Sequence, residues 1–511
     1  MIFIKDLCDL VAIPAHSPFE PSCRRDGCRQ QGEPRRARGG RQDDKQVWHP
    51  RNRRIEAVMK GGIRNPLWFD AADRDQKAWG GTGKTSPILR THRAHSSCRV
   101  PKASCYTSAG SVKPVASNKK GKRVLAAKSA ARERFESACD GLIDLSHRIH
   151  AYPELGFEED QASSWLCESL SDAGFKAEKG ICDLPTAFLA RAGSGPLHIA
   201  ICAEYDCLPE IGHACGHNII AASAVGAALA AAKVADELGL TISVIGTPAE
   251  EVGNASGKIL LLERGAFEGI HAAMMVHPAP FDMLRSKMIA ASMFEVHCTG
   301  KESHASAFPE EGVNAADALT IAQTALGLLR QHIRSTDRIH GIVTNGGAAP
   351  NVVPAHTSAK YIIRSETLDQ LIELRPRVYR CFEAGGLATG AKIEISGGDK
   401  PYAEMRHDEA MARLYRMNSE SLGRKFPNLG EWETRPTGST DMGNVSLAMP
   451  SIHPSIGINS LPAVNHQPEF AAHCVTPDAD KALRDGALAM AWTCIDLAME
   501  LDVRQGLMAR R

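Results

Sequence analysis

The sequence predicts an α/β fold: a mostly parallel sheet flanked by helices, with an inserted α+β lid domain of ferredoxin-like type. Short apolar runs typical of strands, namely LHIAIC, TISVIG and AAMMV, alternate with helical patterns such as HNIIAASAVGAALAAAKVADEL. This alternation is typical of a parallel sheet covered by helices. From residue 289 to 397 the pattern changes to strand, helix, strand, strand, helix, strand, which indicates a second compact unit inside the first.

These elements divide the chain into segments. The apolar spacing of ESACDGLIDLSHRIHAYPELGFEE predicts that the folded part begins near Ala127, with a helix that ends at Pro153. The main domain is therefore expected in residues 127–288 and, after the lid of residues 289–397, in residues 398–505. Lid helices are predicted at Ala315–His332 and Leu371–Ala384, and main-domain helices at Glu409–Leu422 and Ala479–Leu501.

The charge is unevenly distributed along the chain. Residues 1–125 hold 26 Lys and Arg against 11 Asp and Glu, about +15, whereas residues 126–511 hold 34 against 48, about −14. The first segment has no sustained hydrophobic period, so it is predicted to be a disordered basic extension. Its GGTGKTS segment resembles a phosphate-binding loop, but Ala78 replaces the first glycine and no strand precedes it. The acidic remainder argues against a nucleic-acid partner.

The cysteines and the apolar runs of the sequence indicate in which cellular compartment the protein is expected. The fifteen cysteines are scattered and odd in number, which favours a reducing environment over a disulfide framework. Lys5, Asp6 and Asp9 interrupt the first apolar run, unlike the core of a signal peptide. The longest apolar stretch, Ile219–Ala235, contains a serine and a lysine and suits a buried helix better than a membrane span. A cytoplasmic protein without a membrane partner is expected.

Three predicted strands run directly into residues of types that bind metal ions. Because the carboxyl ends of parallel strands lie at one edge of a sheet, residues far apart in the sequence are expected to converge there. The residues are Glu204, Asp206, Cys215 and His217 after LHIAIC, Glu250 and Glu251 after TISVIG, and His277 after AAMMV.

Taken singly, each residue has a simpler interpretation as a buried thiol, a core histidine or a solvated carboxylate. Their combination at strand ends, with Cys and His two apart in HACGH, favours a metal site. Thiolate, imidazole and carboxylate suit zinc or manganese, and they are too many for one four-coordinate ion, so two divalent ions are predicted. Of Glu250 and Glu251, one would be a ligand and the other the base for an activated water; these residues alone do not decide which.

Eight segments resemble those of the aminoacylase and carboxypeptidase-type metallopeptidases. The resemblance runs from about Leu145 to Leu497 and is strongest to the amidohydrolase branch that contains aminobenzoyl-glutamate hydrolase and β-alanyl-lysine dipeptidase-like proteins. It implies a zinc-peptidase-like catalytic domain and a homodimer formed through the lid. The segments are RIHAYPELGFEE, EYDCLPEIGHACGHN, GTPAEE, VHP, SHASAFPEEGVNAADA, GGAAPNVVPAHTSAKYIIRS, GSTDMGN and NHQPEF.

The resemblance also implies a role for each site residue. Glu250 would be the general base, and Asp206 would support the site from behind the ligands. The lid residue His304 would help to hold the oxyanion, in the active site of a partner subunit. Asn351 and Arg364 would contact the substrate, for which arginine offers a bidentate fork to a carboxylate. The metal ligands would be Cys215, His217, Glu251, His277 and His466.

Two short segments depart from the commoner pattern of these relatives. Asn218 replaces Asp, for which we expect altered local hydrogen bonding without loss of metal. Glu204 and Tyr205 replace Asp-Met, which leaves a direct role for Glu204 in doubt.

Together these features predict a metal-dependent amidohydrolase. Its expected substrates are N-acyl amino acids, aminoacyl-glutamate conjugates or small dipeptides, cleaved by a metal-activated water. One alternative is a metal-binding but catalytically inactive regulatory protein of the same fold, against which the presence of Glu250 argues. Nucleic-acid binding through the basic extension is a third interpretation and ranks last.

Overall fold

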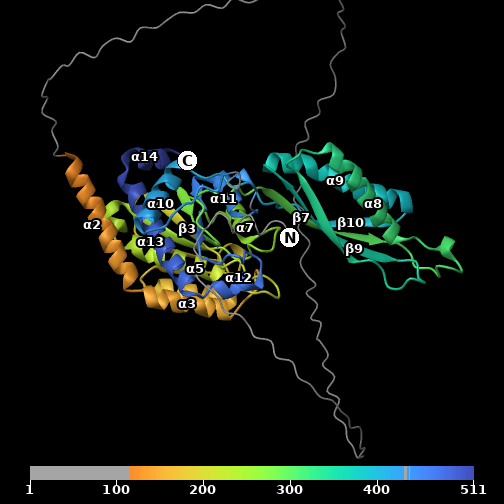
Figure 1. Cartoon of the computed structure of the whole chain (residues 1–511), viewed down its shortest axis with the longest axis horizontal. Helices are drawn as coiled ribbons and strands as arrows, with labels where there is room; N and C mark the ends of the chain where they lie inside the picture. Colours follow the sequence, from red (N-terminus) through yellow and green to blue (C-terminus); the bar gives the residue numbers. More distant parts are fainter. Residues whose placement is uncertain (1–115, 431–433, 437, 511) are drawn as a thin grey trace, which may run out of the picture. The chain divides into compact units, whose positions relative to one another are not determined.

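The computed structural model describes residues 116–510 apart from 431–433 and 437 (Figure 1). Most of the predicted basic extension, including GGTGKTS, lies outside the described residues. Its last part is helical: α2 (Ala116–Glu136) begins before Ala127, so the predicted start of the folded part is too late. Buried Phe135 anchors this helix in the core, and Arg123 pairs with Glu237 at 3.3 Å. The first turns of α2 are rich in lysine and have no periodic apolar residues, so the sequence pattern did not predict this part of the helix.

The main sheet has six strands in the order β1-β2-β4-β3-β5-β11. Its centre and one side are parallel, from β4 through β3 and β5 to β11, whereas β1 and β2 add an antiparallel edge. The parallel centre agrees with the predicted fold class. The strands are β1 (Lys176–Lys179), β2 (Phe188–Ala192), β3 (Leu197–Ala203), β4 (Leu240–Gly246), β5 (Ala272–Met274) and β11 (Ser451–Ile452), and a separate parallel pair joins β6 (His277–Ala279) to β12 (Ser455–Gly457).

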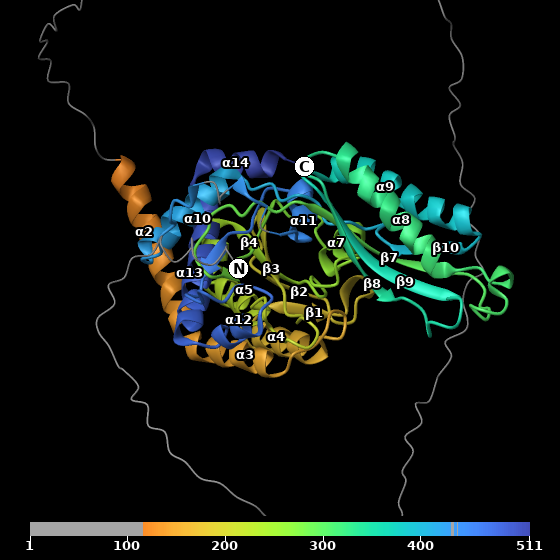
Figure 2. The same cartoon turned by 45° about the vertical axis from the view of Figure 1, so that its right-hand side comes forward.

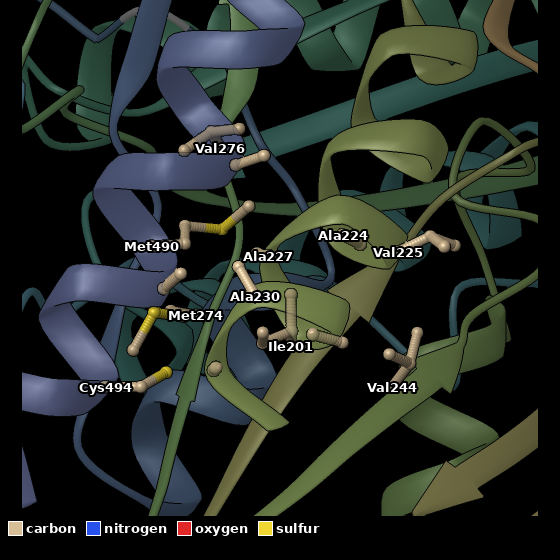
Figure 3. Packing of buried hydrophobic residues seen from close by; sticks show 14 of the residues in the cluster. Ile201, Ala224, Val225, Ala227, Ala230, Val244, Met274, Val276, Met490 and Cys494 are labelled. Atoms are coloured by element: carbon tan, nitrogen blue, oxygen red, sulfur yellow. The ribbon is translucent and has the colours of Figure 1, made fainter. Parts of the chain in front are cut away.

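Helix α5 (His217–Ala232) is central to the packing of this domain. Nearly every side chain of α5 is buried, because the sheet lies on one side and α13 (Pro477–Met499) on the other (Figure 3). Figure 3 shows Met490 of α13 and Met274 and Ile201 of the sheet gathered around Ala227 and Ala230 of α5. The many alanines of α5 let both neighbours approach closely, so the residues at its first turn are held firmly.

The remaining helices lie around this centre (Figures 1 and 2). The predicted last helix corresponds to α13, which ends at Met499; a further helix that was not predicted, α14 (Leu501–Ala509), follows the extended residue Glu500. Among the described residues no helix is long and apolar enough to cross a membrane. The other helices are α3 (Cys139–Ala151), α4 (Asp160–Asp172), α6 (Ala235–Leu238), α7 (Gly257–Glu263), α10 (Glu409–Ser421), α11 (Met442–Ala448) and α12 (Pro468–His473).

The second sheet has the order β10-β7-β9-β8 and is antiparallel throughout (Figure 2). Its order of elements along the chain is the predicted strand, helix, strand, strand, helix, strand. Aromatic rings of β7, β9 and the second helix pack together in its own core. The elements are β7 (Ala290–Thr299), α8 (Ala315–Leu329), β8 (Arg338–Asn345), β9 (His356–Ser365), α9 (Leu368–Thr389) and β10 (Lys392–Gly397).

Candidate functional site

The HACGH segment connects the end of β3 to the first turn of α5. Gly216 separates Cys215 from His217 and has φ of +81°, a left-handed conformation that glycine adopts without strain. A Cβ at Gly216 would lie 2.9 Å from Cγ of Pro278, the residue after His277. The absence of a side chain therefore lets this turn approach the strand that carries His277.

The PAEE segment after β4 is held in a strained turn. Ala249 has φ of +59°, which a residue with a side chain adopts only when its surroundings hold it there. Buried Glu159 accepts a hydrogen bond from the Ala249 N–H at 2.8 Å, and the Tyr402 hydroxyl donates to the Glu250 carbonyl. Neither support was predicted from the sequence, although Glu159 stands in the quoted segment GFEE. They orient the two glutamates towards the cysteine and histidines.

All five predicted ligands converge in overlapping groups. The Cys215 Sγ lies 3.4 Å from His277 Nε2 and 3.6 Å from His466 Nε2, and His466 Nε2 lies 3.6 Å from Glu251 Oε1. In each group the possible ligand atoms lie within 4.8 Å of one another. The groups are Cys215 with His217 and His277, Cys215 with Glu251 and His466, and His217 with Glu250 and Glu251.

The donor set fits divalent metal ions. His217 Nε2 and Glu251 Oε1 are buried and have no hydrogen-bond partner among the described residues. Buried polar atoms are rarely left without a partner, so these two indicate a cation between them. Burial lowers the pKa of His277 to about 4, which keeps its ring neutral, the form that binds a metal.

Asp206 supports two of these residues at once. One oxygen lies 2.9 Å from His217 Nδ1, and the other accepts a hydrogen bond from the Glu251 N–H at 2.9 Å. A carboxylate on the far nitrogen of a histidine fixes the ring so that its Nε2 faces the metal.

Lys258 of α7 is a feature that was not predicted from the sequence. Its ammonium group is fully buried and donates to Glu204 Oε1 and Asp441 Oδ1, both at 2.6 Å. Glu204, Glu250 and Asp441 form a fourth group of close carboxylates. Burial, together with the charges of Glu204 and Glu251, raises the pKa of Glu250 well above its usual range. The second oxygen of Glu204 is buried and has no hydrogen-bond partner among the described residues; it lies 3.5 Å from His217 Nε2.

The contacts of Asn218 explain its departure from the commoner aspartate. Its amide group donates to Ser146 Oγ at 2.9 Å and to the Cys474 carbonyl at 3.0 Å. An ionised aspartate could not donate either bond. Both bonds therefore depend on the amide group of Asn218.

The three lid residues predicted for the site, His304, Asn351 and Arg364, lie in two separate parts of the lid. His304 and Asn351 are exposed on neighbouring loops, joined by the backbone bond from Ala305 N to Asn351 O, and neither belongs to the groups of possible metal ligands. Arg364, at the end of β9, donates to Ser439 Oγ at 2.6 Å. Ser439 is two residues from Asp441, so Arg364 lies beside the segment that reaches the buried carboxylates.

Comparison with known proteins agrees with this geometry. A family model described as a peptidase dimerisation domain matches residues 290–387. The chain is 37% identical to the mouse Xaa-Arg dipeptidase over 393 residues, which cover 74% of this chain and 90% of that protein. It is 32% identical to one of the subunits of Escherichia coli p-aminobenzoyl-glutamate hydrolase over 272 residues, 49% of this chain and 56% of that one.

A solved structure has the same fold. It is a dinuclear metal-binding peptidase of the M20 family from Bacillus subtilis, with a TM-score of 0.54 and 21% identity, and the match covers 71% of this chain and 99% of that chain. The match to the dipeptidase has 37% identity and covers nine-tenths of that protein, and the predicted lid matches a peptidase dimerisation domain. Proteins that share only a fold do not reach this similarity in sequence. The chain belongs to the M20 family of metallopeptidases.

Proposed function

We propose that this M20 family member is a metal-dependent amidohydrolase that cleaves the amide bond of N-acyl amino acids, aminoacyl-glutamate conjugates or small dipeptides. The observation that carries the proposal is the convergence of sulfur, imidazole and carboxylate atoms from four separate segments, with the buried Glu250 beside them. We assign two divalent ions, zinc or manganese, to Cys215, His217, Glu251, His277 and His466.

In this proposal Glu250 moves the proton. When bound, two divalent ions would polarise the amide carbonyl and lower the pKa of a water molecule. Glu250 takes a proton from the attacking water and delivers it to the amine nitrogen as the carbon–nitrogen bond breaks. The raised pKa of Glu250 supports this role, because the carboxyl group must hold the proton between the two steps. Asp206 keeps His217 and Glu251 oriented throughout.

His304 is proposed to hold the oxyanion. Its Nδ1 accepts hydrogen bonds from the N–H groups of Ser306 and Ala307, so a neutral ring carries its proton on Nε2. That N–H can donate to a negatively charged oxygen. Because His304 is exposed on the lid, the proposal has it act in the active site of a second subunit, with Asn351 beside it.

The homodimer that this requires is proposed to form through the lid. Strand β8 is an edge strand, and Ile342 and Val343 on it are 65% and 45% exposed. An exposed apolar edge strand is a surface that pairs readily with another chain. Light scattering should give a molar mass of two chains. Ile342→Lys should lower this mass towards that of a single chain and reduce the activity.

Arg364 is proposed to bind a carboxylate next to the scissile amide. Burial without a neighbouring acid lowers the pKa of its guanidinium. A half-buried cation of this kind is stabilised when an anionic group of the substrate reaches it. The two relatives are named for different amine halves, an arginine residue in one case and a glutamate conjugate in the other.

The proposal is tested by metal analysis followed by hydrolysis assays on the full chain. We expect about two equivalents of zinc or manganese per chain and release of amine from a panel of acyl amino acids and dipeptides. Glu250→Gln should retain the metal and slow hydrolysis roughly 10²- to 10⁴-fold. Metal-free protein after reconstitution would overturn the ligand set. Two bound ions without turnover on any compound would support the inactive alternative.

A further inference from the structure

Glu204 follows directly after β3 and is completely buried, and its two carboxylate oxygens have different surroundings. Its Oε1 accepts a hydrogen bond from the Lys258 ammonium group at 2.6 Å, whereas its Oε2 has no hydrogen-bond partner among the described residues. Lys258 also contacts Asp441, so one ammonium group offsets only one of two buried carboxylates. Buried polar atoms are rarely left without a partner, so the Oε2 atom indicates a further cation or donor beside it.

The Oε2 atom of Glu204 lies next to two of the predicted metal ligands. It is 3.5 Å from His217 Nε2, which is in turn 3.8 Å from Glu251 Oε1. All three atoms are buried and lack a hydrogen-bond partner within the described part of the chain. Two atoms that bind one tetrahedral ion at about 2.1 Å are about 3.4 Å apart, so both separations are close to those of neighbouring ligands. One cation could therefore satisfy atoms that the protein itself leaves without partners.

The proposed role of Glu250 also calls for another ligand. His217 and Glu251 form a group of possible ligands whose third member is Glu250. A general base must exchange its proton, so Glu250 is poorly suited to remain bound to a metal ion. Glu250 also belongs to the group that contains Glu204, so the two groups adjoin. A catalytic zinc ion commonly has three protein ligands and one open position, and Glu204 can supply the third ligand in place of Glu250.

We infer that Glu204 is a further metal ligand, with its Oε2 on the ion held by His217 and Glu251. The inference rests on the proposed function, which assigns five ligands and leaves Glu204 out. Lys258 fixes the other oxygen of Glu204, as Asp206 fixes the far nitrogen of His217, and such outer contacts orient a ligand towards its ion. Glutamate at this position, where aspartate is commoner among the relatives, extends the carboxylate by one methylene group.

The test measures zinc binding by the full chain in a chelator competition. Glu204→Gln keeps the size of the side chain but removes its charge. One of the two ions should then bind more than about 100-fold more weakly, since loss of a residue that only supports a ligand costs about 10- to 100-fold. Asp441→Asn is the matched control, because it takes the other carboxylate from Lys258. It should weaken zinc binding by less than about tenfold, below the range for a supporting residue.

A crystal structure of the zinc-loaded wild type decides the matter if Glu204→Gln does not fold. Glu204 Oε2 should lie about 2.0–2.2 Å from an ion, and a water molecule in that place would overturn the inference. A smaller loss of affinity in Glu204→Gln would also overturn it, as would an equal loss in Asp441→Asn, because Glu204 would then act through Lys258. These results leave the hydrolase intact. Wild-type protein that binds no zinc after reconstitution would overturn the proposed function, and the inference with it.

Discussion

Replacing Lys258 by methionine should destabilise the protein far more than removing an ordinary ion pair. The ammonium group is completely buried and lies 2.6 Å from an oxygen of Glu204 and 2.6 Å from one of Asp441. Methionine keeps most of the volume but leaves two buried carboxylates without their cation. Removal of one partner from a buried ion pair costs about 3–5 kcal/mol, because the remaining charge stays uncompensated.

This cost converts to a shift in melting temperature. With an unfolding entropy of roughly 2.1 cal/mol/K per residue over about 390 described residues, a loss of about 4 kcal/mol lowers Tm by about 5 °C. Scanning calorimetry of metal-free protein measures it directly. The matched control is Lys392→Met, whose side chain is 70% exposed and whose partner Glu394 is 58% exposed, so that water screens the pair and its loss should barely change Tm.

The reasoning would be refuted if Lys258→Met and Lys392→Met melted at the same temperature. A second variant keeps the expectation falsifiable if Lys258→Met does not fold. Adding Glu204→Gln to Lys258→Met removes one of the two stranded charges, so it should recover part of the lost stability. No recovery would mean that packing, and not charge, accounts for the effect.

Three further outcomes are expected. Asp206→Asn should weaken metal binding about 10- to 100-fold in a chelator competition, because the histidine loses the carboxylate that orients it; unchanged affinity would contradict this. Arg364→Lys should raise KM for carboxylate substrates more than it lowers kcat, since lysine offers no bidentate fork, and an unchanged KM would remove Arg364 from the substrate site. Burial and the Asp206 charge raise the pKa of Glu159 to about 7, above its unfolded value of about 4.3. The Glu159 contribution to stability is therefore full below about pH 4 and is lost as the pH rises to 7. In denaturant titrations of the metal-free protein, the free energy of unfolding of the wild type should fall by up to about 3 kcal/mol over this pH range relative to that of Glu159→Gln. Parallel pH profiles of the two proteins would count against the raised pKa.

The parallel centre of the main sheet and the convergence of the predicted ligands could be predicted because both follow from local patterns. Apolar runs of strand length were each followed by residues of types that can bind metal, and parallel strands bring their carboxyl ends to one edge. Thus Cys215, Glu251 and His277 meet although 62 residues separate the first from the last. His466 had no strand before it, and only the resemblance assigned it to the site.

Other features depend on contacts that no local pattern reveals. Lys258 stands at the start of the run GKILLL, where a charged residue is ordinarily solvated; its partners are 54 residues before it and 183 after it. Helix α2 was missed for the opposite reason. Its first turns are polar and its place in the fold comes from the buried residues of its second half, such as Ala131 and Phe135. Tertiary contacts decide both cases.

The buried lysine also accounts for the different chemistry of two glutamates that share one group. Burial alone would raise the pKa of Glu204, but the charge of Lys258, together with His217, His277 and His453, outweighs it, so the pKa is lowered and the carboxylate stays charged. Lys258 gives its other short bond to Asp441, and Glu250 is left with burial and like charges that raise its pKa. Where neighbouring groups have pKa values pushed apart in this way, the group with the raised value is the one suited to exchange a proton. Glu204 is then a fixed negative charge facing His217, and the raised pKa of Glu250 supports its proposed role as the residue that carries the proton from water to amine.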